Sequence, residues 1–254
     1  MVNPFSYLLA GIRAIVLLLI MSVFLLIYLP IDAIFKISTP KRTFWLRRLY
    51  VRICNPILGI RVKITGRPYD GTALYVCNHR SLSDPLIIAP YIDAYIIAKS
   101  EVSSIPILDS GAKLTGIIYV SRESQDSRSA VRQKMVDTLL SGINVFVYPE
   151  GTVNDKIELL EYKKGTFLEA DKNNIPIVPL IVEYKHEKDY WDNRKMVSQF
   201  FRQFGKLFTN TKLHIGEPMS DSDGLELHRQ VMEWSQQQVY DIHKNWDSYL
   251  SRQI

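Results

Sequence analysis

The stretch Tyr75-Val-Cys-Asn-His-Arg-Ser-Leu-Ser-Asp-Pro85 contains the junction from which the rest of the chain can be interpreted. The apolar run from Ala73 to Cys77 has the length of a buried strand. Asp84 and Pro85 place a capping carboxylate and a first-turn proline at the start of a helix. These residues therefore predict a strand, a turn that carries His79, and a helix that begins at Asp84.

His79 and Asp84 are candidates for an acid–base pair. An imidazole changes charge near neutral pH, and a carboxylate can hold it in one tautomer, so the pair could take a proton from a hydroxyl group. The purely structural alternative is that Asp84 only caps the helix and His79 only ends the strand. These residues alone do not choose between the two interpretations.

The composition indicates one sizeable globular domain with an appendage, since the chain has 254 residues of which 47% are hydrophobic. The two cysteines, Cys54 and Cys77, lie far apart, which argues against a disulfide framework and fits a reducing compartment. The five histidines are scattered, so no metal site is expected. The net charge of +5 suits an anionic partner, either nucleic acid or a membrane surface.

Residues 1–35 are predicted to be an N-terminal helical membrane anchor. The segment from Ala14 to Leu29 carries no charge, but it is slightly short for the roughly 20 residues that a spanning helix needs. The helix could span the bilayer if it extends back through Phe5, with Arg13 snorkelling to the surface. It could also enter the bilayer and return, and the sequence leaves both geometries open.

Residues 36–70 form a basic segment without an acidic residue between Lys36 and Arg67. Directly after an apolar anchor, such a segment is typical of a cytoplasmic flank that contacts anionic lipids. We therefore expect a protein on the inner face of the membrane with its catalytic domain in the cytoplasm. An ordinary solvated helix face is the alternative, and nucleic acid is not expected because no nucleic-acid-binding module is visible. The cations are Lys36, Lys41, Arg42, Arg47, Arg48, Arg52, Arg61, Lys63 and Arg67.

Strands and helices alternate from residue 60 onward, and residues 71–254 are predicted to form the main domain. This order predicts an α/β fold with a largely parallel or mixed central sheet flanked by helices. The expected strands are Arg61–Thr65, Ala73–Cys77, Tyr95–Ala98, Gly116–Val120, Val145–Tyr148 and Ile175–Val182, and the expected helices are Ser129–Leu140 and Leu225–Leu250.

Polar residues follow several of these strands, and the carboxyl ends of parallel strands meet at one edge of a sheet. His79, Arg122 and Glu150 could therefore converge there. The basic and aromatic segment Lys185–Phe208 is interpreted as core packing, with a second membrane-contacting surface as the alternative.

Four short motifs occur in a fixed order. The first is NHxxxxD, matched by Asn78-His79 with Asp84, and the second is GxxFIxR, matched by Gly116 to Arg122. The third is PEGT, matched by Pro149-Glu-Gly-Thr152, and the fourth is VPxxI, matched by Ile177 to Ile181. Before the second motif, Lys99 through Pro106 is similar to the pattern KxEL…P. Together they resemble the glycerolipid acyltransferase family, which acylates lysophosphatidic acid (1-acyl-glycerol-3-phosphate). The resemblance covers roughly residues 60 to 185.

The resemblance implies an enzyme that moves an acyl group from an acyl-carrier-protein or coenzyme A thioester to a lysophospholipid hydroxyl at a membrane, without a cofactor. It implies that His79 is the general base and that Asp84 orients it. The residues that it implies for substrate binding are Asn78, Lys99, Arg122, Glu150, Gly151 and Thr152, with Arg122 on the acceptor's phosphate. Backbone amides near Asn78–Ser81 could stabilise the oxyanion.

Val153 departs from the family pattern, which often continues with arginine after PEGT. Either Arg122 and Lys99 suffice for a phosphate, and the product is phosphatidic acid, or the acceptor is a lyso-aminolipid without a phosphate. A catalytically silent membrane scaffold and a hydrolase are alternatives of other classes.

Overall fold

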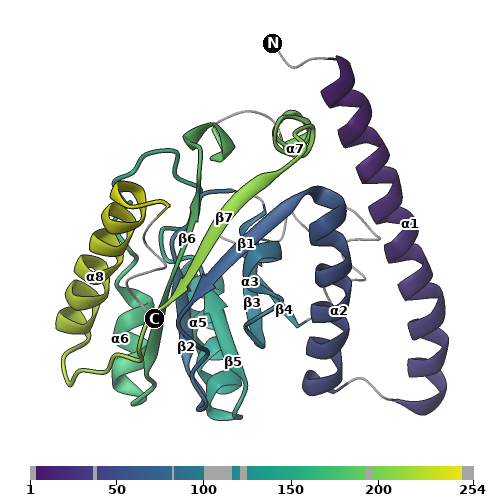
Figure 1. The fold of residues 1–254 in the computed structure, drawn as a ribbon. Helices are drawn as coiled ribbons and strands as arrows, with labels where there is room; N and C mark the ends of the chain where they lie inside the picture. Colours follow the sequence, from purple (N-terminus) through teal and green to yellow (C-terminus); the bar gives the residue numbers. More distant parts are fainter. Residues whose placement is uncertain are drawn as a thin grey trace.

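The computed structural model describes residues 4–36, 39–81, 83–99, 116–120, 125–192 and 196–247. Within these residues, strands β1 to β7 form one sheet in the order β1-β7-β6-β2-β5-β3-β4 (Figure 1). The strands are β1 Ile60–Thr65, β2 Leu74–Cys77, β3 Ala94–Lys99, β4 Ile117–Val120, β5 Asn144–Val147, β6 Ile177–Tyr184 and β7 Thr209–Ile215. The helices are α1 Pro4–Phe35, α2 Pro40–Leu58, α3 Asp84–Ile88, α5 Gln125–Leu140, α6 Gly165–Lys172, α7 Met196–Phe204 and α8 Gly224–Lys244.

The sheet is mixed, which confirms the predicted fold class. Strands β6, β2, β5, β3 and β4 run parallel to one another, whereas β7 pairs antiparallel with β6 and parallel with β1. Sequence reasoning missed β7 because Thr209-Asn-Thr-Lys-Leu-His-Ile215 lacks an apolar pattern. Its polar side chains find partners inside the fold instead, since His214 Nδ1 lies 2.7 Å from Thr65 Oγ1 of β1. Strand β1, from the segment 36–70, thus belongs to the same sheet.

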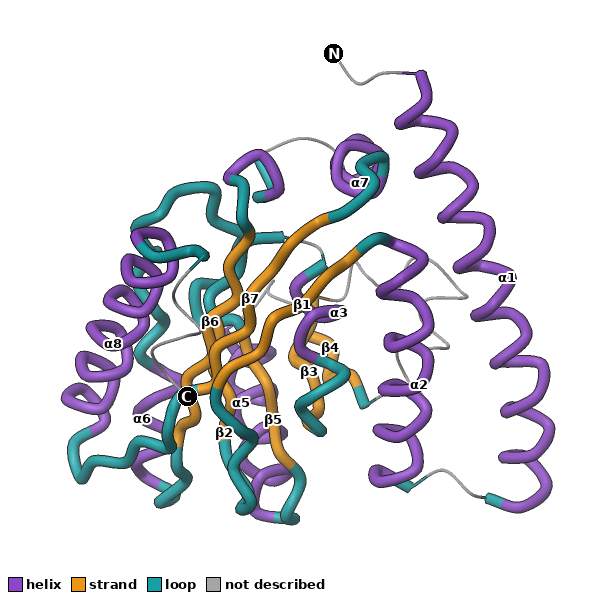
Figure 2. The backbone as a smooth tube through the Cα atoms, viewed as in Figure 1, coloured by secondary structure: helices purple, strands orange, loops and turns teal. Residues whose placement is uncertain are grey.

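Helices cover both faces of the sheet, and Figure 2 shows the strands between α8 and α6 on one side and α2 on the other. Tyr75 and Cys77 of β2 pack toward α2, α3 and α7, whereas Leu74 and Val76 pack toward α5, α6 and α8. All four side chains are buried. The strand is a continuous apolar run because neither of its faces meets water.

Helix α1 lies along the side of the domain, beside α7 and α2 (Figure 1). Near the start of α1, the ring centroid of Tyr7 lies 5.4 Å from that of Phe201 of α7. Further along the helix, the ring centroid of Phe24 lies 5.6 Å from that of Tyr50 of α2. Among the described residues, α1 is the helix that is long and apolar enough to cross a membrane. Its exposed apolar side chains include Phe5, Leu8, Ile12, Ile15, Leu19, Val23, Leu26 and Ile27.

Arg13 does not snorkel, so that prediction was wrong. Its guanidinium donates to the carbonyl oxygens of Phe204 (2.7 Å), Lys206 and Leu207 (3.1 Å). These carbonyls lie at and just beyond the end of α7, where backbone acceptors have no partner within the helix and the helix dipole favours a cation. The one charge in the first half of α1 therefore fastens this helix to the domain.

Arg47 of the basic segment faces inward, which corrects for this residue the prediction that the cations of the segment contact lipid head groups. Arg47 is buried and donates to the carbonyls of Ile92 (3.0 Å) and Ala94 (2.8 Å). Arg48 pairs with Asp93 at 2.9 Å. The buried guanidinium joins α2 to the connection between α3 and β3 and is not available to a membrane.

Part of the segment Lys185–Phe208 packs in the core, and its membrane-contacting role stays a prediction. Phe204 is buried and Phe200 packs on the same core, as the core interpretation predicts. Phe208 is 51% exposed, and the guanidinium of Arg61 lies 3.4 Å from its ring centroid.

Candidate active site

His79 and Asp84 meet at the junction between β2 and α3. His79 Nδ1 lies 2.7 Å from Asp84 Oδ2, and the two side chains are 20% and 0% exposed. Because an ionised carboxylate only accepts hydrogen bonds, Nδ1 carries the hydrogen and Nε2 keeps its lone pair. Nε2 has no hydrogen-bond partner among the described residues. The geometry presents an imidazole ready to accept a proton at Nε2.

The carboxylate of Asp84 is itself held by several donors. Oδ2 accepts the backbone N–H groups of Arg80 (2.7 Å) and Ser81 (2.9 Å), and Oδ1 accepts the hydroxyl of Tyr184 (2.6 Å). Both oxygens of this fully buried carboxylate therefore accept hydrogen bonds. All these partners precede α3 or come from β6, so the side chain does not cap the helix that it begins. The purely structural interpretation of Asp84 as a helix cap was therefore wrong.

Tyr148 fixes the plane of the imidazole. The two rings stack with centroids 3.9 Å apart and planes 16° apart. Burial raises the pKa of the Tyr148 phenol well above its ordinary value, and the charge of Asp84 acts in the same direction.

The turn after β5 closes on the backbone of His79. Glu150 Oε1 accepts the His79 N–H at 2.9 Å, and Oε2 accepts the Leu160 N–H at 3.1 Å. Burial raises the pKa of Glu150, although these amides and the cation of Arg80 oppose the rise. His79 and Glu150 thus converge at the carboxyl ends of the parallel strands β2 and β5, as predicted from their places at strand ends. The role of Glu150 toward an acceptor hydroxyl stays a prediction.

Gly151 allows this turn to form. Its φ of +76° lies in the left-handed region that favours glycine, and a Cβ atom would lie 2.3 Å from Lys163 Nζ. Thr152 is exposed. Substrate contacts of Gly151 and Thr152 stay predictions.

Three of the backbone amides near Asn78–Ser81 that we expected to stabilise an oxyanion already have partners. The amide of His79 donates to Glu150, and those of Arg80 and Ser81 donate to Asp84. These three contacts give no support to the expected oxyanion role, and the oxyanion donor stays a prediction.

Sequence reasoning missed a buried ionic network beneath the dyad. The side chains of Arg80 and Glu183 are both 0% exposed, and Arg80 Nε lies 2.8 Å from Glu183 Oε1. Glu183 Oε2 accepts the Tyr190 hydroxyl at 2.6 Å and lies 3.0 Å from His243 Nε2. A charged residue in the otherwise apolar run of β6 was the one available signal.

Asn78 belongs to the same network. Its Nδ2 donates to the Val182 carbonyl and to Glu183 Oε1, both at 3.0 Å, and its Oδ1 accepts the Val182 N–H at 2.8 Å. With the side chain buried and its amide engaged on both sides, this geometry gives no support to the predicted substrate contact. Asn78 instead joins the end of β2 to β6.

Arg80→Met is expected to lower the free energy of unfolding by about 3–5 kcal/mol, because Glu183 would stay buried without its cation. Burial by itself raises the pKa of Glu183, but Arg80 and His243 outweigh burial and lower it. The ionised carboxylate therefore stabilises the fold above its unfolded-state pKa, and this contribution is lost as the pH falls through the folded-state pKa. The deficit of the variant should be largest at neutral pH and should shrink as the pH falls.

Denaturant unfolding followed by tryptophan fluorescence in micelles, at neutral and at acidic pH, measures this effect. Arg229→Met is the matched control, since Arg229 is exposed and pairs with Glu226 and Glu233 on the surface of α8. Equal stability losses in the two variants would contradict a special role for the buried pair.

Two of the cationic residues predicted for substrate binding, Lys99 and Arg122, cannot be placed in the site. Lys99 ends β3, but its side chain is not among those described, and Arg122 lies outside the described residues.

Cys77 is fully buried, and burial raises the pKa of its thiol well above the ordinary value. A covalent role for this cysteine therefore has no support. Within the described part of the chain, no group of three or more His, Cys, Asp or Glu side chains could hold a metal ion.

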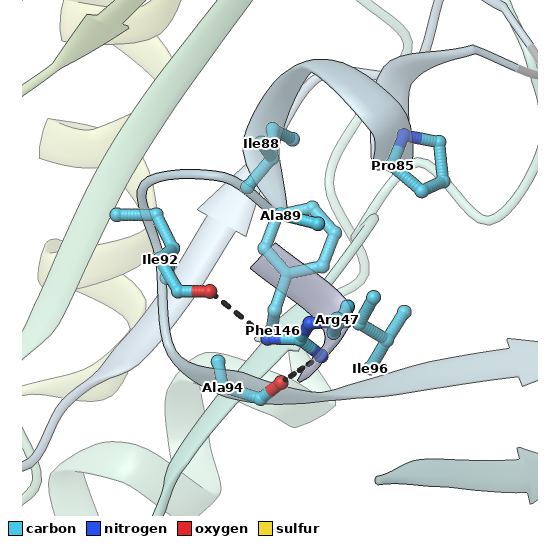
Figure 3. A pocket seen from close by; sticks show the side chains of 8 residues that line it. All are labelled: Arg47, Pro85, Ile88, Ala89, Ile92, Ala94, Ile96 and Phe146. Atoms are coloured by element: carbon cyan, nitrogen blue, oxygen red, sulfur yellow. Dashed lines mark hydrogen bonds between the residues drawn. The ribbon is translucent and has the colours of Figure 1, made fainter. Parts of the chain in front are cut away.

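A small, mostly apolar pocket lies beside α3, and neither His79 nor Asp84 lines it (Figure 3). It is lined by Arg47, Pro85, Ile88, Ala89, Ile92, Ala94, Ile96 and Phe146. Pro85 and Ile88 belong to α3, which Asp84 begins, so the pocket lies on the same short helix as the carboxylate. Arg47 closes one side through the two carbonyl contacts drawn in the figure.

Comparison with known proteins agrees with the motifs. A family model described as Acyltransferase matches residues 60–183. The lyso-ornithine lipid O-acyltransferase of Rhizobium meliloti is 31% identical over 59% of this chain and 51% of its own length. The 1-acyl-sn-glycerol-3-phosphate acyltransferase of Borreliella burgdorferi is 28% identical over 54% of this chain and 57% of its own length. The chain thus spans about half the length of the curated relatives that it matches.

A solved structure extends the likeness to most of the fold. The crystal structure of the 1-acyl-sn-glycerophosphate acyltransferase PlsC from Thermotoga maritima has a TM-score of 0.68 at 20% identity, covering 92% of this chain and 97% of that one. At this identity the likeness concerns the fold, and it includes the mixed sheet and the flanking helices.

Proposed function

We propose that this chain moves a fatty acyl group from a thioester to the free hydroxyl of a lysophospholipid, because a family model described as Acyltransferase matches residues 60–183. The observation that carries the proposal is the 2.7 Å contact between His79 and Asp84, which leaves Nε2 available as a base. The lead acceptor is 1-acyl-glycerol-3-phosphate, and the product is then phosphatidic acid. The donor is an acyl-carrier-protein or coenzyme A thioester.

Each step of the transfer has a group to perform it. Nε2 of His79 takes the proton of the acceptor hydroxyl as its oxygen attacks the thioester carbonyl, and Asp84 stabilises the resulting imidazolium. The C–O bond forms, the C–S bond breaks, and the imidazolium returns the proton to the departing thiolate. No acyl-enzyme is required, because both substrates meet at the same imidazole.

The membrane is proposed to lie against α1. This helix packs on α7 at Tyr7 and on α2 at Phe24, and this packing along the domain favours a helix that lies along the membrane over one that crosses it. An orientation near the membrane plane, on the inner face, brings its exposed apolar side chains into lipid and keeps the catalytic domain in the cytoplasm. Exposed cations that follow it, such as Arg42, would face anionic head groups.

A second acceptor class has its own support. Val153 stands where the phosphate-using pattern often has arginine, and some matched relatives are lyso-ornithine lipid O-acyltransferases. A lyso-aminolipid would use the same base and the same thioester without a phosphate clamp.

An acceptor panel with the purified full chain in micelles tests the function. Lysophosphatidic acid and lyso-ornithine lipid are each offered with acyl-carrier-protein and coenzyme A thioesters, and diacyl product is quantified by mass spectrometry. The proposal expects a diacyl product with at least one pair. Thioester loss without a diacyl lipid would indicate a hydrolase instead, and no turnover with any pair would favour a silent scaffold.

Arg122→Ala is expected to lower kcat/KM for lysophosphatidic acid about ten- to a hundredfold, because a charge-assisted bond to the phosphate would be lost. Turnover of lyso-ornithine lipid should change little. The measurement is the ratio of the two rates in one preparation, with Arg229→Ala as the surface-arginine control. An unchanged ratio would refute the phosphate-binding role of Arg122.

A further inference from the structure

We propose that Gln203 of α7 is a positioning residue for the dyad, acting through Ser83 and Tyr184 on Asp84. The inference rests on the proposed function and adds to it a residue outside all four motifs. Gln203 is 5% exposed, and α7 lies far from His79 in the sequence. It is a positioning residue because it touches neither His79 nor Asp84.

A continuous row of hydrogen bonds joins Gln203 to the carboxylate. Gln203 Nε2 donates to Ser83 Oγ at 2.7 Å, and Ser83 Oγ lies 2.7 Å from the Tyr184 hydroxyl. The Tyr184 hydroxyl donates to Asp84 Oδ1 at 2.6 Å. The same glutamine accepts the Ser81 hydroxyl at 2.9 Å through Oε1, so it also holds the turn between His79 and α3.

The direction of the row follows from its last member. A carboxylate only accepts, so the single hydroxyl hydrogen of Tyr184 goes to Asp84. Ser83 must then donate to Tyr184, which leaves the Ser83 oxygen to accept from Gln203. Because each member donates toward Asp84, the bonds polarise one another in the same sense. Gln203 thereby strengthens the donor that holds Oδ1 while Oδ2 faces His79.

Helix α7 is held in place from its other side. Arg13 of α1 binds the carbonyls of Phe204, Lys206 and Leu207, directly after Gln203 in the chain. Helix α1 is thus connected to the dyad through α7, because Arg13 binds the carbonyl of Phe204 and the preceding residue, Gln203, contacts Ser83. Helix α1 therefore packs directly behind the part of α7 that supplies Gln203.

Gln199 provides a matched comparison on the same helix. It is 3% exposed, similar to Gln203, but its Nε2 donates to the carbonyl and carboxylate of Asp192, at 3.0 Å and 2.7 Å. None of its hydrogen bonds reaches Ser81, Ser83 or Asp84. Replacing either glutamine by methionine removes buried hydrogen bonds at similar volume, so the two variants differ chiefly in the connection to the dyad.

The first experiment compares kcat and KM of Gln203→Met and Gln199→Met with the wild type. Gln203→Met should lower kcat about tenfold or more with KM within about twofold, because the base is misplaced while the substrate sites are kept. Gln199→Met should keep kcat within about twofold. Equal losses in the two variants would overturn the proposal, since a merely structural role predicts them.

A double-mutant cycle with Tyr184→Phe tests the route. If Gln203 acts through Tyr184, the variant that carries both changes should have nearly the kcat of Tyr184→Phe alone. Losses that multiply would overturn the route.

A third measurement needs no lipid, which separates this inference from the proposed function. Diethyl pyrocarbonate modifies an accessible neutral imidazole, and the rate at His79 is followed by peptide mass spectrometry. Gln203→Met should slow this modification and Gln199→Met should not. If the modification rate of His79 is unchanged in both variants, the positioning role is refuted, even if the enzyme is active. If the wild type has no acyltransferase activity but Gln203→Met still slows the modification of His79, only the proposed acyl transfer is refuted.

Discussion

His79→Ala should lower the rate of diacyl lipid formation by about 10³- to 10⁴-fold while the protein stays folded. The imidazole of His79 contacts the buried carboxylate of Asp84 through Nδ1 and keeps Nε2 without a hydrogen-bond partner among the described residues. Without it the acceptor hydroxyl must attack with its proton still attached. The residual rate would reflect the binding of both substrates side by side.

The rate is measured as initial velocity of diacyl product with the acceptor that the panel identifies. His186→Ala is the control, because His186 lies in an exposed turn after β6 and should leave the rate within about twofold of the wild type. A His79→Ala protein that keeps a tenth of the wild-type rate would rule out His79 as the base.

The local part of the site could be predicted from the sequence because its geometry is short in range. His79 and Asp84 are five positions apart across a strand-to-helix junction, so few backbone paths are available to them. The meeting of His79 with Glu150 followed from a general property of parallel strands, whose carboxyl ends share an edge. The mixed sheet and the flanking helices followed in the same way from the alternation of apolar and polar segments.

The supporting part could not be predicted because its contacts are distant in the chain. Arg80 meets Glu183 across 103 positions, and Gln203 meets Ser83 across 120 positions. Polar side chains such as these are expected at the surface when only the sequence is known. They are buried here because a helix or strand distant in the sequence supplies a hydrogen-bonding partner. The same reason explains the missed strand β7, whose lysine and histidine are buried.

The position of α1 is the other feature that composition alone could not give. An apolar helix with one arginine suits a spanning segment whose charge snorkels to the surface. The structure instead uses Arg13 to bind carbonyls at the end of α7, which places the helix along the domain. The proposed membrane helix α1 thereby packs against α7, the helix whose Gln203 contacts Ser83 beside the dyad.

Asp84→Asn removes the negative charge from the dyad while keeping its shape. At Oδ2 the amides of Arg80 and Ser81 require an acceptor, so the new side chain should keep its oxygen there and turn its amide group toward Tyr184. His79 would then keep its tautomer but lose the charge that stabilises the imidazolium. We expect a loss of about 10³-fold in kcat with little change in KM.

The most direct test of the account is therefore the kcat of Asp84→Asn, measured with the purified full chain and the acceptor that the panel identifies. Unfolding of the same preparation should show that the variant remains folded. A fall of about 10³-fold in a folded protein is the result that a charged His79–Asp84 pair predicts. A kcat within about tenfold of the wild type would contradict it, since the base would then work without its carboxylate.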